Sequence, residues 1–113
     1  MSITYQRFFA PQQIPAVDTS IFTVPATPQQ TVLKSMRVRL ANTTNAAAAV
    51  TLYAVPAGGS AGPANACLPG VSIGANDYLD VDVPDMAAGD SLHALGGTTN
   101  AITITQLDGF LKS

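Results

Sequence analysis

Residues 31–56 have the sequence TVLKSMRVRLANTTNAAAAVTLYAVP, and this stretch decides the fold. Apolar and polar residues alternate before and after a polar turn, Asn-Thr-Thr-Asn, at residues 42–45. Alternation with a period of two is typical of a strand that has one buried and one exposed face. Asn and Thr suit a tight turn because their side chains can hydrogen-bond the local backbone. We therefore predict two strands joined as a hairpin.

Each of these two strands has an inward face in the prediction. The inward side chains are Met36, Val38 and Leu40 on the first strand, and Val50, Leu52 and Ala54 on the second. Arg37 and Arg39 fall on the outward face, because successive side chains of a strand point to opposite sides. A slip of one residue would bury both arginines, so the register is strongly specified.

Further short strands are expected at 20–24, 66–68, 71–73, 78–83, 91–95 and 101–107, separated by turns rich in Gly, Pro and Asn. No segment predicts a convincing helix. The pattern predicts an all-β fold, an antiparallel β-sandwich of jelly-roll or immunoglobulin-like type with seven to eight short strands. We predict one core that contains Val38, Leu40, Val50, Leu52, Leu79, Val81, Ile102 and Ile104. Residues 20–113 form the single sandwich domain, and residues 1–19 form an extended N-terminal arm.

The composition limits the possible classes of function. Of the 113 residues, 47% are hydrophobic and only 11% are charged, and the net charge is −2. This balance argues against nucleic-acid binding, which needs a basic patch. No apolar run has the length of a membrane span or a signal peptide, so we expect a protein made in the cytoplasm of its producer and without a membrane partner. A surface with so few charges fits a protein that is partly covered by partners.

The arm contains three of the seven aromatic residues, Tyr5, Phe8 and Phe9. These side chains either pack back over their own sandwich or insert into a neighbouring subunit. Pro11 and Pro15 prevent the arm from forming a regular element of its own. We expect contacts beyond its own sandwich to order the arm, so that deleting residues 1–15 leaves a folded domain that no longer assembles.

Few residues carry the chemistry of an active site. Asp80 and Asp82 share one face of a predicted strand, where they could bind Ca²⁺, act as the two carboxylates of a glycosidase, or form a solvated or cross-subunit acidic face that meets Arg37 and Arg39. We predict the last of these. His93 is expected on an outward, solvated or interface face, and Cys67 as a small buried residue. We predict no enzyme activity, catalytic residue, cofactor or metal.

The chain resembles a family of small structural proteins of tailed bacteriophages. The resemblance rests on ITYQRFFAPQQIP at 3–15, TSIFTVPAT at 19–27, RVRLANTTNAAAAVTLYAVPAGGSAGPAN at 37–65, and VSIGANDYLDVDVPDMAAGDSLHALGGTTNAITI at 71–104. It implies a β-sandwich located in the virion, similar to capsid decoration (cement) proteins that bridge subunits of the major capsid protein. A protein of the tail or fibre apparatus is the alternative within the same family.

The expected partners are other copies of this chain, as a homo-oligomer and most simply a trimer, together with the major capsid protein or another virion protein. Edges of small sandwiches must be charged, covered or paired, and few charges are present here to protect them. Tyr5, Phe8, Phe9, Arg37, Arg39, Asp80 and Asp82 are the candidate interface residues. A carbohydrate-binding module is a further alternative, with Tyr53 and Tyr78 as the possible sugar platforms.

Overall fold

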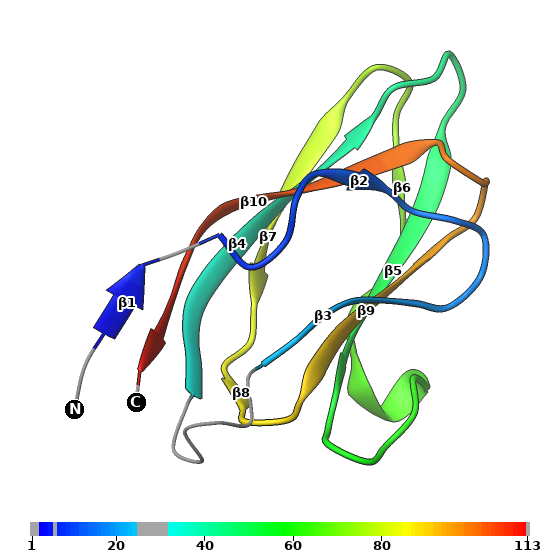
Figure 1. The fold of residues 1–113 in the computed structure, drawn as a ribbon. Helices are drawn as coiled ribbons and strands as arrows, with labels where there is room; N and C mark the ends of the chain where they lie inside the picture. Colours follow the sequence, from blue (N-terminus) through cyan, green and yellow to red (C-terminus); the bar gives the residue numbers. More distant parts are fainter. Residues whose placement is uncertain (1–2, 6, 25–31, 113) are drawn as a thin grey trace.

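The computed structural model describes residues 3–5, 7–24 and 32–112, and the side chains of 7–24 and 36–109. This part of the chain contains ten strand segments, one short 3-10 turn and no α-helix (Figure 1). The elements are β1 (Ile3–Tyr5), β2 (Gln12–Gln13), β3 (Thr19–Thr23), β4 (Val32–Asn42), β5 (Ala48–Val55), η1 (Pro63–Asn65), β6 (Ala66–Ile73), β7 (Tyr78–Val83), β8 (Met86–Ala87), β9 (Ser91–Gly96) and β10 (Ile102–Lys112).

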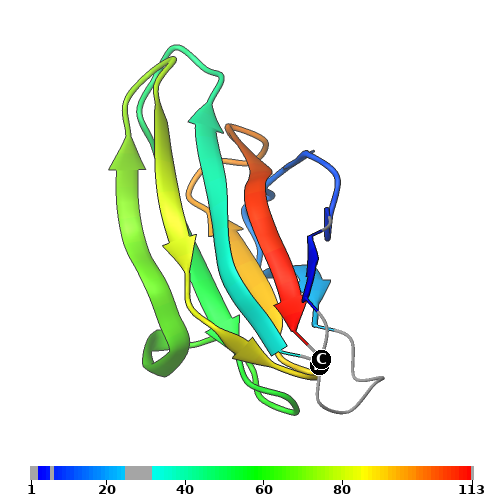
Figure 2. The same cartoon turned by 90° about the vertical axis from the view of Figure 1, so that its left-hand side faces the viewer.

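The strands form two antiparallel sheets packed face to face. The first sheet has the order β1-β10-β4-β7, with β2 beside β10 and β8 beside β4, and the second has the order β3-β9-β5-β6. In Figure 2 the strands β7, β4, β10 and β1 lie side by side, with β5, β9 and β3 behind them. The predicted antiparallel β-sandwich is confirmed, although β1, β2 and β8 are additional segments of only two or three residues.

The connectivity distinguishes between the two predicted types of sandwich. β1 pairs with β10, β3 with β9, β4 with β7, and β5 with β6, so the pairs are nested one inside the next along the chain. One long antiparallel ribbon is thus folded over on itself, and the pairings of β10 with β4 and of β9 with β5 join it into two sheets. Nested pairing of eight strands in two sheets is the arrangement of a jelly roll.

The predicted hairpin at 31–56 is wrong in its pairing. β4 belongs to the first sheet and β5 to the second, so the turn at 42–45 crosses between the two layers instead of joining hydrogen-bonded neighbours. The alternation itself is correct: Met36, Val38 and Leu40 face the core from one sheet, and Val50 and Leu52 face it from the other. A period of two specifies which face is buried but not which strand lies alongside.

The side chain of Asn42 stabilises the turn at which the chain crosses from the first sheet to the second. Its side chain is 2% exposed and makes four hydrogen bonds. The amide nitrogen donates to the carbonyl oxygens of Ala46 and Ile73, at 2.8 and 3.0 Å. The amide oxygen accepts from the backbone N–H and the hydroxyl of Thr44, at 2.9 and 2.7 Å. A buried amide that is fully paired in this way fixes the turn, because each unpaired buried group is costly.

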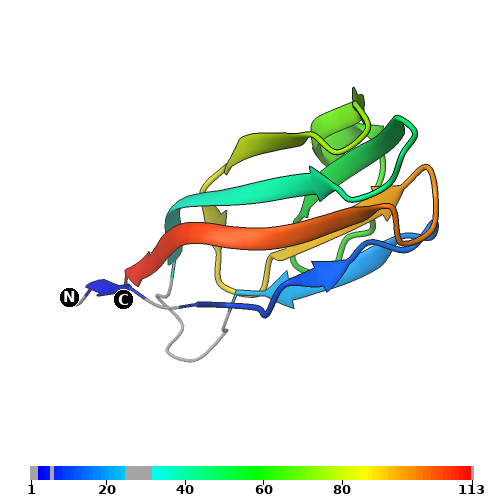
Figure 3. The same ribbon diagram turned by 90° about the horizontal axis from the view of Figure 1, so that it is seen from above.

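The core lies between the two sheets, and Figure 3 shows β4 and β10 running side by side in the first of them. Six of the eight predicted core residues are buried: Val38, Leu40, Val50, Leu52, Ile102 and Ile104. The other two, Leu79 and Val81, are half-buried and pack against this cluster, because β7 lies at the edge of its sheet. The two strands predicted at 66–68 and 71–73 form one strand, β6, whose register shifts around Pro69 and Gly70.

The N-terminal segment is part of the sandwich, so the expectation that it is ordered chiefly by outside contacts is corrected. β1 and β2 both pair with β10 and extend the first sheet (Figure 1). Ile14 is fully buried and Phe9 is 8% exposed. The Ile14 N–H donates to the Ile102 carbonyl at 2.8 Å, and the Gly96 N–H donates to the Pro15 carbonyl at 3.0 Å. Ile14 is the residue that the prediction overlooked.

Replacing Ile14 with Ala should destabilise the protein by about 2–5 kcal/mol, because the change removes buried methyl groups and leaves a cavity. Val17→Ala is the matched control, since Val17 lies three residues along the same segment and is 64% exposed. The control should change the free energy of unfolding by no more than about 0.5 kcal/mol. Chemical denaturation monitored by circular dichroism measures both variants. Equal stabilities would show that the segment is not part of the core.

Candidate interface on the outer face of the first sheet

The predicted charged residues gather on the outer face of the first sheet. Arg37 and Arg39 lie on β4, where the buried partners Met36, Val38 and Leu40 force the alternate side chains outward. β7 pairs with β4 without any shift in register, which places Asp80 opposite Arg39 and Asp82 opposite Arg37. The predicted contact between the two arginines and this acidic strand therefore forms within one chain, and the pair that forms is Arg39 with Asp80.

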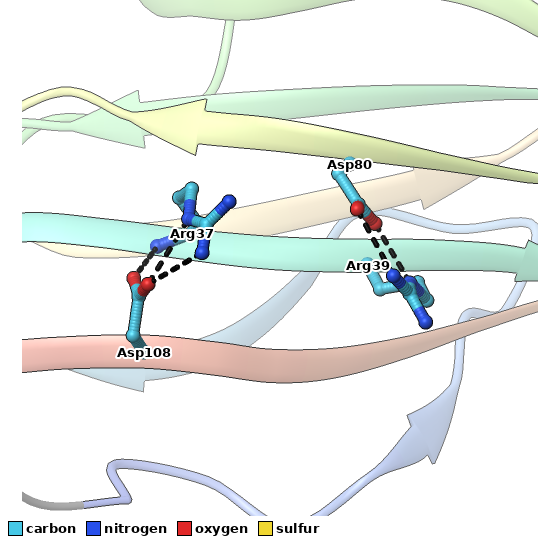
Figure 4. Close-up of polar contacts among 4 residues, drawn as sticks. All are labelled: Arg37, Arg39, Asp80 and Asp108. Atoms are coloured by element: carbon cyan, nitrogen blue, oxygen red, sulfur yellow. Dashed lines mark hydrogen bonds and ion pairs between the residues drawn. The ribbon is translucent and has the colours of Figure 1, made fainter.

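Arg39 and Asp80 form a two-pronged ion pair across the strands (Figure 4). Arg39 Nε donates to Asp80 Oδ1 at 2.8 Å, and its second guanidinium nitrogen donates to Oδ2 at 3.1 Å. The guanidinium carbon also lies 4.3 Å from the centre of the Tyr78 ring, a cation–π contact. The hydrogen bonds from Arg39 hold the pKa of Asp80 below its ordinary value, with smaller contributions from the charges of Arg39 and Arg37.

Arg37 turns the other way and pairs with Asp108 on β10 (Figure 4). Its Nε and a terminal nitrogen donate to Asp108 Oδ2 at 3.0 and 2.8 Å, and its backbone N–H donates to Oδ1 at 3.1 Å. The register of β10 against β4 shifts on both sides of Asp108, so a bulge directs this carboxylate toward Arg37. The sequence analysis did not identify Asp108, because a bulge breaks the alternation from which faces are assigned.

Asp82 is left without an ion pair among the described side chains. It lies in register with Arg37 on the neighbouring strand, but Arg37 is committed to Asp108. Asp82 is exposed and occupies the open side of the sheet, since no described strand pairs with β7 on the side away from β4. The outer face therefore has two satisfied ion pairs and one unpaired carboxylate at its edge.

The aromatic residues predicted for an interface are placed differently. Phe8 and Phe9 stack on either side of Phe22, with ring centres 5.5 and 5.7 Å away. Phe9 belongs to the core, and Phe8 is half-buried against it. Of the two alternatives left open for these aromatic side chains, packing over their own sandwich is the one that Phe8 and Phe9 adopt. Tyr5 lies on β1, and its side chain is outside the described residues.

His93 lies on the second sheet and has two polar neighbours. Its Nδ1 is 3.0 Å from Asp18 Oδ1, and its Nε2 is 3.4 Å from Ser91 Oγ. These are the residue types of a catalytic triad, but the Ser–His distance exceeds the usual range for an activated nucleophile. Ser91 also lies on β9, between β3 and β5, so the sheet ladders take up the backbone N–H groups that could stabilise an oxyanion. The arrangement ties the segment before β3 to the second sheet.

Two further aspartates, Asp77 and Asp90, hydrogen-bond nearby backbone groups. Asp90 accepts hydrogen bonds from the N–H groups of Ala57 and Ala87, and Asp77 accepts one from Tyr78. Among the described residues, no group of three or more His, Cys, Asp or Glu side chains is placed to hold a metal ion. Cys67 is half-buried, and burial raises the pKa of its thiol.

The comparisons with known proteins add one likeness. No family model and no curated protein matches the chain. A solved structure described as "Bacillus endospore appendages form a novel family of disulfide-linked pili" superposes with a TM-score of 0.56 at 14% sequence identity. The match covers 97% of this chain and 86% of that one. At this identity the likeness concerns the fold alone. The described part of the chain contains no helix that is both long and apolar enough to cross a membrane.

Removing the Arg39 guanidinium should raise the pKa of Asp80, because the largest cause of its low value is the hydrogen bonding from Arg39. Arg37→Gln is the matched control and should raise the same pKa by less, since Arg37 acts on Asp80 only through its charge. NMR titration of the Asp80 carboxyl carbon in wild type, Arg39→Gln and Arg37→Gln shows whether the pKa of Asp80 rises more in the first variant than in the second.

The lowered pKa of Asp80 determines how its contribution to the stability of the fold changes with pH. Asp80 binds its proton less tightly in the folded than in the unfolded chain, so its contribution is present above the unfolded pKa and is lost as the pH falls through the folded pKa. Arg39→Gln should therefore weaken the dependence of stability on acidic pH. An equal pKa of Asp80 in Arg39→Gln and Arg37→Gln would contradict the ion pair between Arg39 and Asp80.

Proposed function

We propose that this chain is a non-enzymatic structural subunit that associates with copies of itself in a larger assembly. The observation that carries the proposal is the open edge of the first sheet. β7 is a regular six-residue strand that pairs with β4 alone among the described strands, in uninterrupted register. Such an edge exposes unpaired backbone groups, and natural proteins cover it, charge it or pair it. Here Asp80 and Asp82 are the charged residues of the strand, and Asp80 also pairs with Arg39.

Two further considerations support a structural role. The solved structure with a similar fold is described as one of the endospore appendages that form pili. Jelly rolls also occur in viral capsid and lectin domains, although the argument from fold to function is one of analogy. The polar residues that could have formed an active site are instead used in hydrogen bonds between strands and turns.

We place the assembly in the virion of a tailed bacteriophage, as a decoration protein that bridges capsid subunits. This finer proposal is supported by the sequence resemblance to small virion proteins, with a tail or fibre location as its alternative. The carbohydrate-binding alternative has less support, because Tyr53 belongs to the second sheet and Tyr78 to the first. The two rings therefore cannot form one platform, and Tyr78 is already stacked on Arg39.

The association we propose is non-covalent. The pili of the similar structure are described as disulfide-linked, whereas these 113 residues contain one cysteine. One cysteine can join two chains at most and cannot link a longer series. The raised pKa of the half-buried Cys67 thiol also reduces the thiolate fraction that reacts.

Sedimentation velocity over a range of micromolar concentrations should show a mass several times the 11.6 kDa of one chain, unchanged by reducing agent. Mass spectrometry of purified phage particles should find peptides of this chain among the structural proteins. A single-chain mass at every concentration, together with absence from the particles, would overturn the proposal. Association without a place in the particles would overturn only the virion setting.

A further inference from the structure

We propose that the β7 edge pairs head-to-tail with the opposite edge of the same sheet, formed by β1 and β2, in a second copy of the chain. This inference rests on the proposed function, because it names the surfaces by which the subunits associate. In the resulting assembly the first sheet continues from one subunit into the next.

The backbone of β7 presents its free groups at alternate residues. The Asn42 N–H donates to the Asp77 carbonyl at 2.8 Å, which marks 42 and 77 as a hydrogen-bonded pair of the β4–β7 ladder. In an antiparallel ladder such pairs alternate with non-bonded pairs, whose N–H and C=O groups point away from the partner. With the register of β7, the outward-pointing groups belong to Tyr78, Asp80 and Asp82. The Tyr78 N–H already donates to the Asp77 carboxylate at 2.8 Å, so the N–H groups that β7 offers to an incoming strand are those of Asp80 and Asp82.

The edges of the second sheet are less suited to pairing. β3 shifts register between Ser20 and Phe22. β6 shifts register twice, once between Val71 and Leu68, where Pro69 lies, and once between Leu68 and Ala66. Bulges and proline are among the devices that keep an edge from extending. Neither interruption occurs within Tyr78–Val83. β7 is therefore the regular open edge of the described strands.

Two-fold pairing of β7 with itself is disfavoured by charge. Directly opposite residues of an antiparallel pair have their side chains on the same face of the sheet, so a residue of β7 on the outer face must lie opposite another residue on the outer face. Two registers of β7 against itself meet this condition and pair five of its six residues. The first places Asp80 opposite Asp80, and the second places Asp80 opposite Asp82. Like charges directly opposite each other are destabilising, so the partner strand should have a different sequence.

The β1 and β2 edge provides a complementary partner. The order β1-β10-β4-β7 is antiparallel throughout, so β7 and β1 run in opposite directions. A second copy in the same orientation therefore continues the alternation. Arg7 lies between β1 and β2 and is exposed. It has no ion pair with the described side chains, whereas Arg37 and Arg39 are both paired. An unpaired arginine on one edge thus faces the edge that has the unpaired Asp82.

A head-to-tail contact either closes into a ring or continues as a filament. The trimer expected from the sequence would be a ring of three. Both forms use the same joint, and variants that block one edge at a time can test it.

Asp82→Pro removes an outward N–H of β7 and keeps the ladder to β4, since that N–H does not point to β4. Asp82→Ala is the matched control, because it removes the carboxylate and keeps the N–H. Arg7→Glu places a negative charge on the other edge and leaves β7 intact. Circular dichroism and thermal unfolding confirm that each variant is folded. Sedimentation velocity then compares wild type, the three variants, and an equimolar mixture of Asp82→Pro with Arg7→Glu.

Wild type and Asp82→Ala should associate, while Asp82→Pro and Arg7→Glu should each sediment as single chains. Their mixture should form a species of two chains, because the intact β7 of one variant meets the intact β1 and β2 edge of the other. Association of Asp82→Pro equal to that of wild type would overturn the inference while the proposed function stands. Association of Arg7→Glu alone, or a mixture without a new species, would overturn the head-to-tail joint. Failure of wild type itself to associate would overturn the joint, and together with absence from the particles it would overturn the proposed function as well.

Discussion

The alternation of side chains along β4 is the constraint on which the rest of the structure depends. β4 lies inside the first sheet and pairs with β10 along most of its length, and with β7 and β8 on its other side. Its inward residues Met36, Val38 and Leu40 fill the core, and this fixes Arg37 and Arg39 outward. The Arg39–Asp80 ion pair and the contact of Arg39 with Tyr78 follow from that register. The bulge in β10 adds the pair of Arg37 with Asp108, which leaves Asp82 without an ion pair among the described side chains.

The nested pairing of the strands then determines where the sheet ends. Because β4 pairs with β7 and β10 pairs with β1 and β2, the first sheet has an edge formed by β7 on one side and by the N-terminal segment on the other. The N-terminal segment has a second role as well, since Phe9 and Ile14 close the core. A single segment therefore links the stability of one subunit to the surface through which we propose that subunits associate.

The sequence predicted correctly which face of a strand is buried but not which strands pair with each other, and the reason is physical. A period of two records which side chains are buried, so the inward residues of β4, β5 and β10 and the outward position of both arginines could be assigned. It contains no record of the strand alongside, and the stretch 31–56 was therefore taken for a hairpin although its strands lie in different sheets. Asp108 could not be found because a bulge interrupts the alternation, and Asp18 because it meets His93 only through the fold. The arm was judged by its aromatic content, whereas Ile14 and the pairing with β10 hold it in place.

The most direct test of the central claim, that subunits join through the edge of the first sheet, is amide hydrogen exchange along β7. In dilute solution the amides of Asp80 and Asp82 should exchange fast, while those of Leu79, Val81 and Val83 are protected by the ladder to β4. At concentrations where chains associate, all five should be protected. The account would be contradicted if association left the amides of Asp80 and Asp82 exchanging as fast as in the dilute protein.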